Sequence, residues 1–139
     1  MKKFRFRLQK VLDYRLAVEE TAKEAYLEAR VARLAGEFEL QRIKDARKEL
    51  LFQPADCVQK RQDLALALEH SDDLQRLQGS LNQSLEEDEE AKRTEWLERK
   101  QEAEALSKLR EKALDAYSLE EVRFEQKTLD EWASMRRAA

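Results

Sequence analysis

Apolar residues recur at alternating steps of four and three along the first third of the chain. The series runs through Phe4, Leu8, Val11, Arg15, Val18, Ala22, Ala25, Ala29, Ala32 and Gly36. This spacing is the heptad repeat of a helix that packs along another helix. A second apolar line, formed by Leu27, Val31, Leu34 and Phe38, lies beside it. The pattern predicts one long helix from about residue 4 to residue 52.

The first residues also show a second, competing pattern. In FRFRL, the apolar residues Phe4, Phe6 and Leu8 alternate with arginines, as in a half-buried strand. The alternation fails at the following residues, whereas the heptad spacing continues. We therefore expect the opening stretch to begin the helix rather than to form a strand.

The clearest interruption is LFQPADC, where Pro54 disfavours helical geometry in the residue before it and lacks an amide hydrogen. A tip region with a short helix is expected over about residues 53–71. Asp72 with Gln75 then forms a capping box, and a second long helix is expected over about residues 72–136. Its first part carries a line of leucines at helical spacing: Leu74, Leu77, Leu81 and Leu85. Its later part carries one heptad frame: Trp96, Ala103, Leu106, Ala113, Tyr117 and Phe124.

The fold class expected from these patterns is all-α, a long antiparallel two-helix coiled coil that forms a single domain over residues 1–139. Only two glycines and one proline occur, which is too few turn residues for a compact fold with several chain reversals. A short connection between the helices would bring the two termini together in an isolated monomer, and a parallel dimer is the competing arrangement. The expected coiled-coil core includes Phe4, Leu8, Val11, Val18, Leu106, Tyr117 and Phe124.

Charge and composition narrow the function classes. Charged residues make up 41% of the chain, but 27 basic residues against 30 acidic ones leave a net charge of −3, which disfavours a nucleic-acid binder. Cys57 is the single cysteine, so no internal disulfide is expected and a reducing compartment is favoured. The longest run without a polar residue, Leu64 to Leu68, is far too short to insert into a membrane. We expect a soluble, cytoplasmic protein.

No residue pattern indicates catalysis. A two-helix rod offers no concave pocket for positioned acids, bases or nucleophiles, and the chain has no glycine-rich phosphate loop. His70 is the single histidine, and the acidic residues 86–90 are typical of a solvated helix face. We therefore expect no enzyme activity, no metal and no cofactor.

Two stretches resemble the flagellar export protein FliJ family. The opening MKKFRFRLQKVLDYRLAVEETAKEA has the basic and aromatic start, the LxxVLxxR motif and the acidic, alanine-rich helix of that family. The stretch WLERKQEAEALSKLREKALDAYSLEEVRFEQKTLDEWA resembles the family's C-terminal helix, with its EQKxLDE-type ending. The two matches cover most of the chain in the same order.

The resemblance implies a fold similar to the central stalk of rotary ATPases and a part in bacterial flagellar type III protein export. The partners it implies are the hexameric export ATPase, the export gate membrane protein and export chaperones, at the cytoplasmic face of the inner membrane. The candidate partner-binding residues are the basic ones near the two termini: Lys2, Lys3, Arg5, Arg7, Arg136 and Arg137. The alternatives are a stalk subunit of another secretion or rotary ATPase, or a structural coiled-coil scaffold.

Overall fold

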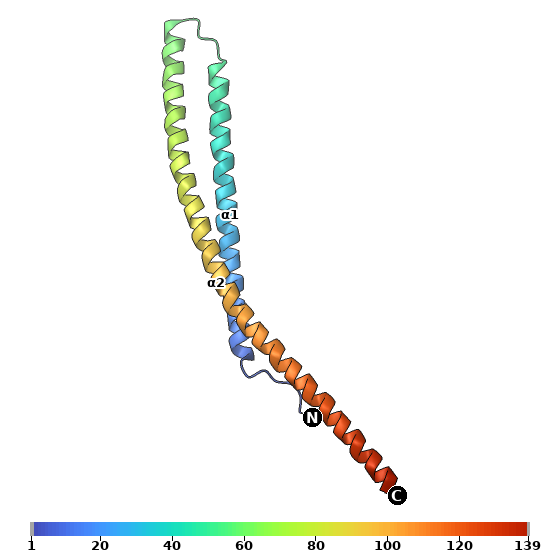
Figure 1. Cartoon of the computed structure of the whole chain (residues 1–139). Coiled ribbons are helices and arrows are strands. Elements are labelled where there is room, and N and C mark those ends of the chain that lie inside the picture. The colour runs from blue at the N-terminus through green and yellow to red at the C-terminus, as the bar shows by residue number, and fades with distance from the viewer. Residues whose placement is uncertain (1, 139) are drawn as a thin grey trace. The chain divides into compact units, whose positions relative to one another are not determined.

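The computed structural model describes residues 2–138 and contains two long helices packed against each other. Helix α1 spans Gln9–Leu51 and helix α2 spans Val58–Ala138 (Figure 1). No strand occurs among residues 2–138. The predicted all-α fold of two coiled-coil helices is confirmed.

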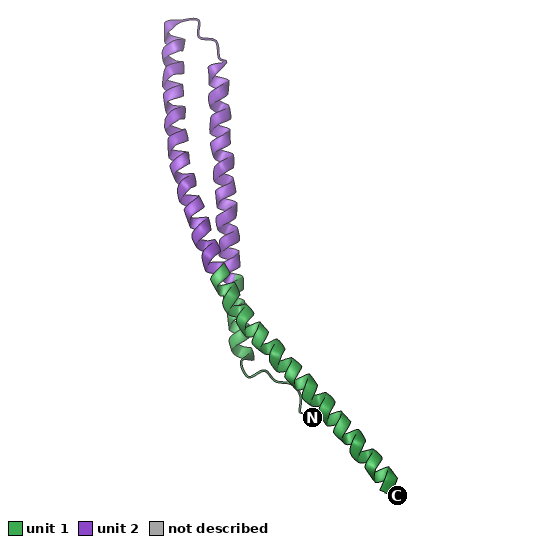
Figure 2. Cartoon of the chain, viewed as in Figure 1, with its two compact units in different colours: residues 1–20, 97–139 green, residues 21–96 purple. Residues whose placement is uncertain are grey.

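The chain divides into two compact units, each formed by parts of both helices. Unit 1 consists of residues 1–20 and 97–139, and unit 2 consists of residues 21–96 (Figure 2). In unit 2 a short connection, residues 52–57, joins the two helices, which therefore run antiparallel.

The helices end and begin at the predicted interruption. At the end of α1 the amides of Phe52 and Gln53 donate to carbonyls three residues earlier, at 3.1 and 3.2 Å, which tightens the last turn. Cys57 caps the start of α2, because its Sγ accepts from the Lys60 amide at 3.5 Å and its carbonyl accepts from the Arg61 amide at 3.1 Å. The single cysteine therefore has a local structural role.

The structure corrects the expected boundaries on both sides. Residues 2–6 are not helical, and α1 begins at Gln9 rather than near residue 4. The expected restart at Asp72 is also wrong, because α2 continues through this position from Val58. Asp72 does not cap a helix there: its carboxylate accepts from Arg47 Nε on α1 at 2.8 Å. Without glycine or proline in HSDD, nothing interrupts the helix.

In unit 2 the seam between the helices is mostly small or polar. The α1 positions that face α2 are buried or half-buried at heptad spacing: Ala22, Tyr26, Ala29, Arg33, Gly36, Leu40, Ile43, Arg47 and Leu50. The matching positions of α2 are Leu64, Leu68, Ser71, Gln75, Gln78, Asn82, Leu85, Glu89, Lys92 and Trp96. Polar side chains thus occupy most of the central α2 positions.

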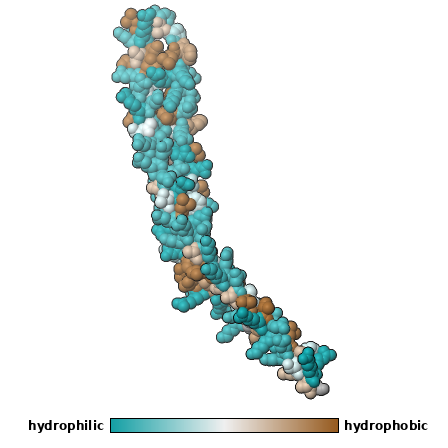
Figure 3. All heavy atoms as spheres, in the orientation of Figure 1, coloured by the Kyte–Doolittle hydropathy of each residue, from teal (hydrophilic) through white to brown (hydrophobic). Residues whose placement is uncertain are grey.

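Of the four leucines expected along this part of α2, Leu85 faces α1 and the other three face solvent. Leu74, Leu77 and Leu81 are 39%, 69% and 52% exposed. On α1 the second apolar line of unit 2 is exposed as well: Leu27, Val31, Leu34 and Phe38. Figure 3 shows such hydrophobic groups scattered among the hydrophilic residues that cover most of the visible face.

The two helices of unit 2 approach each other closely at Gly36. Asn82 is buried, and its Nδ2 donates to the Gly36 carbonyl at 3.1 Å while its Oδ1 accepts from Gln78 Nε2 at 2.9 Å. A Cβ at position 36 would lie 2.4 Å from Asn82 Oδ1 and 3.0 Å from Leu85 Cδ1. Glycine is therefore required here by interhelical space rather than by a turn.

In unit 1 the seam follows the same heptad frame. Leu12 and Ala103 are buried, and Leu8, Val18, Leu106 and Tyr117 are half-buried. Val11, predicted as a core residue, is 44% exposed, so that prediction is wrong. Along α1, every second position of the predicted heptad series is replaced or joined in the seam by the residue that follows it. At Val11 the residue that follows, Leu12, is the buried one.

Phe124 is the second predicted core residue that the structure contradicts, since it is 53% exposed. Helix α1 begins at Gln9, which lies near the level of Arg110 because Arg110 Nε donates to Gln9 Oε1 at 2.9 Å. Beyond Tyr117, α2 has no helix of the described chain beside it, and every residue from 118 to 132 is exposed. The heptad pattern of α2 therefore continues beyond the part of α2 that packs against α1.

Replacing Gly36 with alanine should destabilise unit 2 although alanine is the better helix former. Alanine gains about 1 kcal/mol of helix propensity, but the clash with Asn82 should outweigh it and leave a net loss of about 1–3 kcal/mol. Urea denaturation followed by circular dichroism measures the difference. Gly79→Ala is the matched control, because its Cβ would meet no atom within 4 Å and should stabilise α2. Equal stabilisation by both substitutions would contradict the close approach.

The corrected register makes a second prediction about Leu12 and Val11. Leu12→Ala should lower the free energy of unfolding by about 2–4 kcal/mol, because the side chain is buried against α2. Val11→Ala should change it by less than about 1 kcal/mol, since an exposed side chain loses little buried area. Thermal and urea unfolding of the two variants provide the comparison, and a larger loss for Val11→Ala would restore the register first expected from the sequence.

Candidate functional site

The amino-terminal segment of unit 1, residues 2–8, keeps the alternation seen in the sequence without forming a strand. Phe4, Phe6 and Leu8 are half-buried, whereas Arg5 and Arg7 are exposed. A turn, in which the Gln9 amide donates to the Phe6 carbonyl at 3.1 Å, leads from this segment into α1. The prediction that this stretch begins the helix is wrong, and the two arginines lie on the solvent side.

Contacts with α2 hold the segment in place. The rings of Phe4 and Tyr117 lie 5.4 Å apart at an interplanar angle of 53°, and Arg110 Cζ lies 5.7 Å from the centre of the Phe4 ring. Tyr117 also donates from its hydroxyl to the Lys2 carbonyl at 2.6 Å. Phe4 is therefore held between an aromatic side chain, Tyr117, and a cationic one, Arg110, both of which lie on α2.

A cavity of about 540 Å³ lies along this segment. It is lined by Phe4, Arg5, Phe6, Arg7, Gln9, Lys10 and Arg110. Four of these residues are basic and none is acidic. Arg5, Arg7 and Lys10 form no ion pair with any residue of the described chain. The cavity thus combines aromatic rings with unneutralised positive charge.

The basic residues near the carboxyl end form a separate group. Arg136 Cζ lies 5.2 Å from the centre of the Trp132 ring, and both Arg136 and Arg137 are exposed on α2. Arg136 lies 19 positions after Tyr117 on α2, a distance of roughly 30 Å at 1.5 Å per residue. Since Tyr117 contacts Lys2, the structure does not bring the six predicted partner-binding residues together.

The carboxyl-terminal part of α2 also exposes large apolar side chains. They are Leu119, Val122, Phe124, Leu129, Trp132 and Met135, each more than half exposed. Val122 and Leu129 lie seven residues apart and so share one face of the helix. We call this set the carboxyl-terminal apolar surface. The sequence pattern did not reveal this surface, because it assigned Phe124 to the core.

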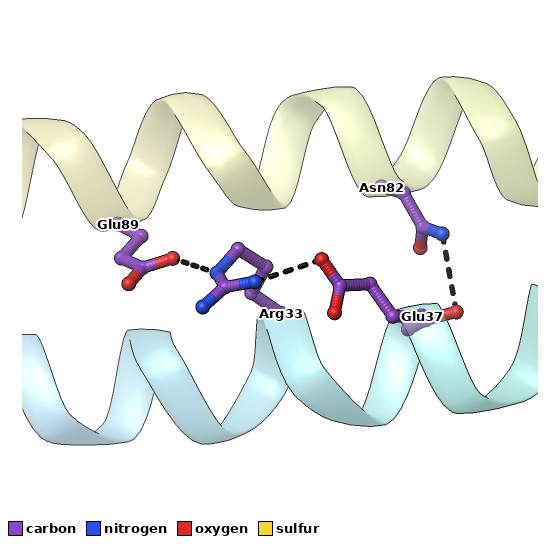
Figure 4. A network of polar contacts seen from close by, with 5 residues as sticks. Arg33, Glu37, Asn82 and Glu89 are labelled. Atoms are coloured by element: carbon purple, nitrogen blue, oxygen red, sulfur yellow. Dashed lines mark hydrogen bonds and ion pairs between the residues drawn. The ribbon is translucent and has the colours of Figure 1, made fainter.

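Unit 2 carries a polar network in its seam (Figure 4). The Arg33 guanidinium donates to Glu89 on α2 and to Glu37 on its own helix, the latter at 2.8 Å. The hydrogen bond with Glu89 is the main reason why the pKa of Arg33 is raised, with Glu37 adding to it and desolvation opposing it. Because Arg33 occupies a seam position, the network links the helices where an apolar pair would be expected.

Further ion pairs join the helices within each unit. In unit 1, Arg15 Nη1 lies 2.7 Å from Glu102 Oε2, and in unit 2 Arg47 pairs with Asp72 as described above. On the outer side of α1, the hydrogen bond from Arg42 lowers the pKa of Glu39, and Glu39 raises the pKa of Arg42. Charge pairing is therefore extensive along the seam, in contrast to the amino-terminal cavity.

The other residues considered from the sequence show no chemistry of a site. His70 is exposed, and Cys57 is an exposed free thiol. Residues 2–138 contain no cluster of three or more His, Cys, Asp or Glu side chains that could hold a metal ion. Trp96 stacks on Tyr26 in unit 2, with ring centres 5.4 Å apart. Neither α1 nor α2 contains, over its described length, a stretch apolar enough to span a membrane.

Comparison with known proteins places the chain in a family. A protein-family model described as "Flagellar FliJ protein" matches residues 4–139. No curated protein and no solved structure gives a significant match. The family match includes the amino-terminal segment, from Phe4 onward, together with both helices and the carboxyl-terminal apolar surface. The chain belongs to the flagellar FliJ protein family.

Proposed function

We propose that this chain is a non-enzymatic component of the bacterial flagellar protein export apparatus that binds the hexameric export ATPase. Membership of the FliJ family gives the chain its association with flagellar export, and the match over residues 4–139 is the observation that carries the proposal. In this proposal the chain also couples the ATPase to the export gate membrane protein and to substrate chaperones. It acts at the cytoplasmic face of the inner membrane, at the base of the flagellum.

Unit 1 supplies the surface proposed to contact the ATPase. Beyond Tyr117 the helix has no partner in the described chain, so its apolar side chains are available to another protein. An amphipathic helix that inserts into a groove or ring gains affinity from a few large apolar side chains, with polar residues around them. Trp132, which carries Arg136 above its ring, has the composition of such an anchor.

The amino-terminal arginines are proposed to guide the encounter. Arg5 and Arg7 are exposed and form no ion pair within the described chain, so their charge is available to acidic groups on a partner. Exposed charges contribute little to folding but increase association rates and make binding sensitive to salt. In this proposal the carboxyl-terminal apolar surface supplies affinity, and the arginines increase the association rate and make binding sensitive to salt.

Charge reversal tests the arginines. The double variant Arg5→Glu, Arg7→Glu should keep the helix content and melting temperature of the original chain, yet bind the purified ATPase more weakly and with less dependence on salt. Binding is measured by titration at several salt concentrations. Arg30→Glu, Lys44→Glu is the matched control, because both residues are exposed cations in unit 2. Unchanged binding by the Arg5 and Arg7 variant would reject these residues as part of the contact.

Substitution in the carboxyl-terminal apolar surface tests the proposed anchor. Val122→Ser, Leu129→Ser should leave unfolding almost unchanged, because both side chains are exposed, but should reduce ATPase affinity at least tenfold. Val31→Ser, Leu34→Ser removes two apolar side chains that are also exposed, but in unit 2, and serves as the control. Unchanged affinity of the Val122→Ser, Leu129→Ser variant would reject the carboxyl-terminal apolar surface as the anchor. If the unmodified chain recovers only itself from a mixture with the ATPase, a structural scaffold becomes the better assignment.

A further inference from the structure

The cavity along the amino-terminal segment has the chemistry of an anion site. We propose that it binds the phosphate group of an anionic ligand that also carries an apolar or aromatic portion. The proposal concerns the isolated chain and does not depend on contact with an ATPase. The volume of the cavity, about 540 Å³, lies within the range of small-molecule sites.

The charges that line the cavity are concentrated and unopposed. Arg5, Arg7, Lys10 and Arg110 contribute four cations, and no carboxylate lines the same space. Elsewhere in the chain arginines at the seam pair with carboxylates, as Arg15 does with Glu102 and Arg47 with Asp72. Like charges held near one another repel, and a bound anion with more than one negative charge would remove that repulsion.

Arg110 is already positioned for a ligand. Its Nε donates to Gln9 Oε1 at 2.9 Å, and its guanidinium lies over the Phe4 ring. These contacts fix the plane of the guanidinium and use only its Nε hydrogen, which leaves the Nη groups as donors. A guanidinium held in this way loses little conformational freedom when it binds a phosphate through two hydrogen bonds.

The beginning of α1 reinforces the positive potential. The helix begins at Gln9, and its first turn contains no acidic residue. The amino-terminal end of a helix carries partial positive charge and is a frequent position for phosphate groups. Lys10 lies in this first turn and also lines the cavity, so its side-chain charge adds to that of the helix end.

Phosphate fits this cavity better than a carboxylate does. A phosphate group carries one negative charge as a diester and up to two as a terminal group, over two or three acceptor oxygens in a small volume, which suits several convergent cations. The Phe4 and Phe6 rings line the same cavity and offer an apolar wall beside the charged groups. Two sources supply this chemistry, the head group of an anionic phospholipid and a soluble nucleotide.

The test uses the full purified chain without any partner protein. Isothermal titration with pyrophosphate and with adenosine diphosphate should show binding that weakens with salt, and the variant Arg7→Gln, Lys10→Gln should reduce the affinity at least tenfold. The matched control is Arg30→Gln, Lys44→Gln, whose affinity should equal that of the unmodified chain. Circular dichroism and melting curves of both variants confirm that the fold is retained.

A vesicle experiment separates the two sources. Binding to phosphatidylglycerol vesicles but not to phosphatidylcholine vesicles, with competition by pyrophosphate, would assign the site to a lipid head group. Tighter binding of adenosine diphosphate than of pyrophosphate, without vesicle binding, would assign it to a nucleotide. The proposal is overturned if no phosphate compound binds, if the control variant loses as much affinity, or if a hexaglutamate peptide binds more tightly than every phosphate probe.

Discussion

The hydrogen bond from Asn82 to the Gly36 carbonyl is the constraint on which the packing of unit 2 depends. A buried side-chain amide needs partners. Gln78, one turn earlier on the same helix, supplies one of them, but the Gly36 carbonyl supplies the other only when α2 turns this face toward α1. That rotation directs Ser71, Gln75 and Glu89 into the seam and leaves Leu74, Leu77 and Leu81 in solvent. A single polar contact therefore decides which residues of α2 are available to other molecules.

The charged residues in the seam act on specificity more than on stability. Replacing a buried ion pair with apolar residues is often neutral or stabilising, whereas removing one partner leaves an uncompensated charge. Arg33 with Glu89, and Arg47 with Asp72, each link the helices across unit 2 at one alignment. A shift of one helix along the other would separate both pairs at once, so the pairs disfavour alternative registers.

Much of this arrangement could be predicted from the sequence, and the failures have physical causes. The frame through Trp96, Ala103 and Leu106 agrees with the structure, where Ala103 is buried and the other two are half-buried. The frame at Val11 was wrong because Leu12 is equally apolar, and heptad spacing alone does not choose between neighbours. The polar seam of unit 2 contradicted the usual rule that leucines face the partner. The basic residues of the amino-terminal segment were recognisable, but their cavity depends on Arg110, which lies about a hundred residues away in sequence.

The non-helical conformation of the amino-terminal segment leaves both of its arginines exposed, which a helix beginning at Phe4 would not do. Side chains two residues apart on a helix point about 200° apart, so Arg5 and Arg7 would face different sides if α1 began at Phe4. In the observed non-helical segment Arg5 and Arg7 are both exposed, while Phe4 and Phe6 are half-buried. Tyr117 and Arg110 hold Phe4 and thereby keep the segment against α2. The alternation in FRFRL thus separates the residues that attach the segment from the residues that present charge, and it does so without a neighbouring strand.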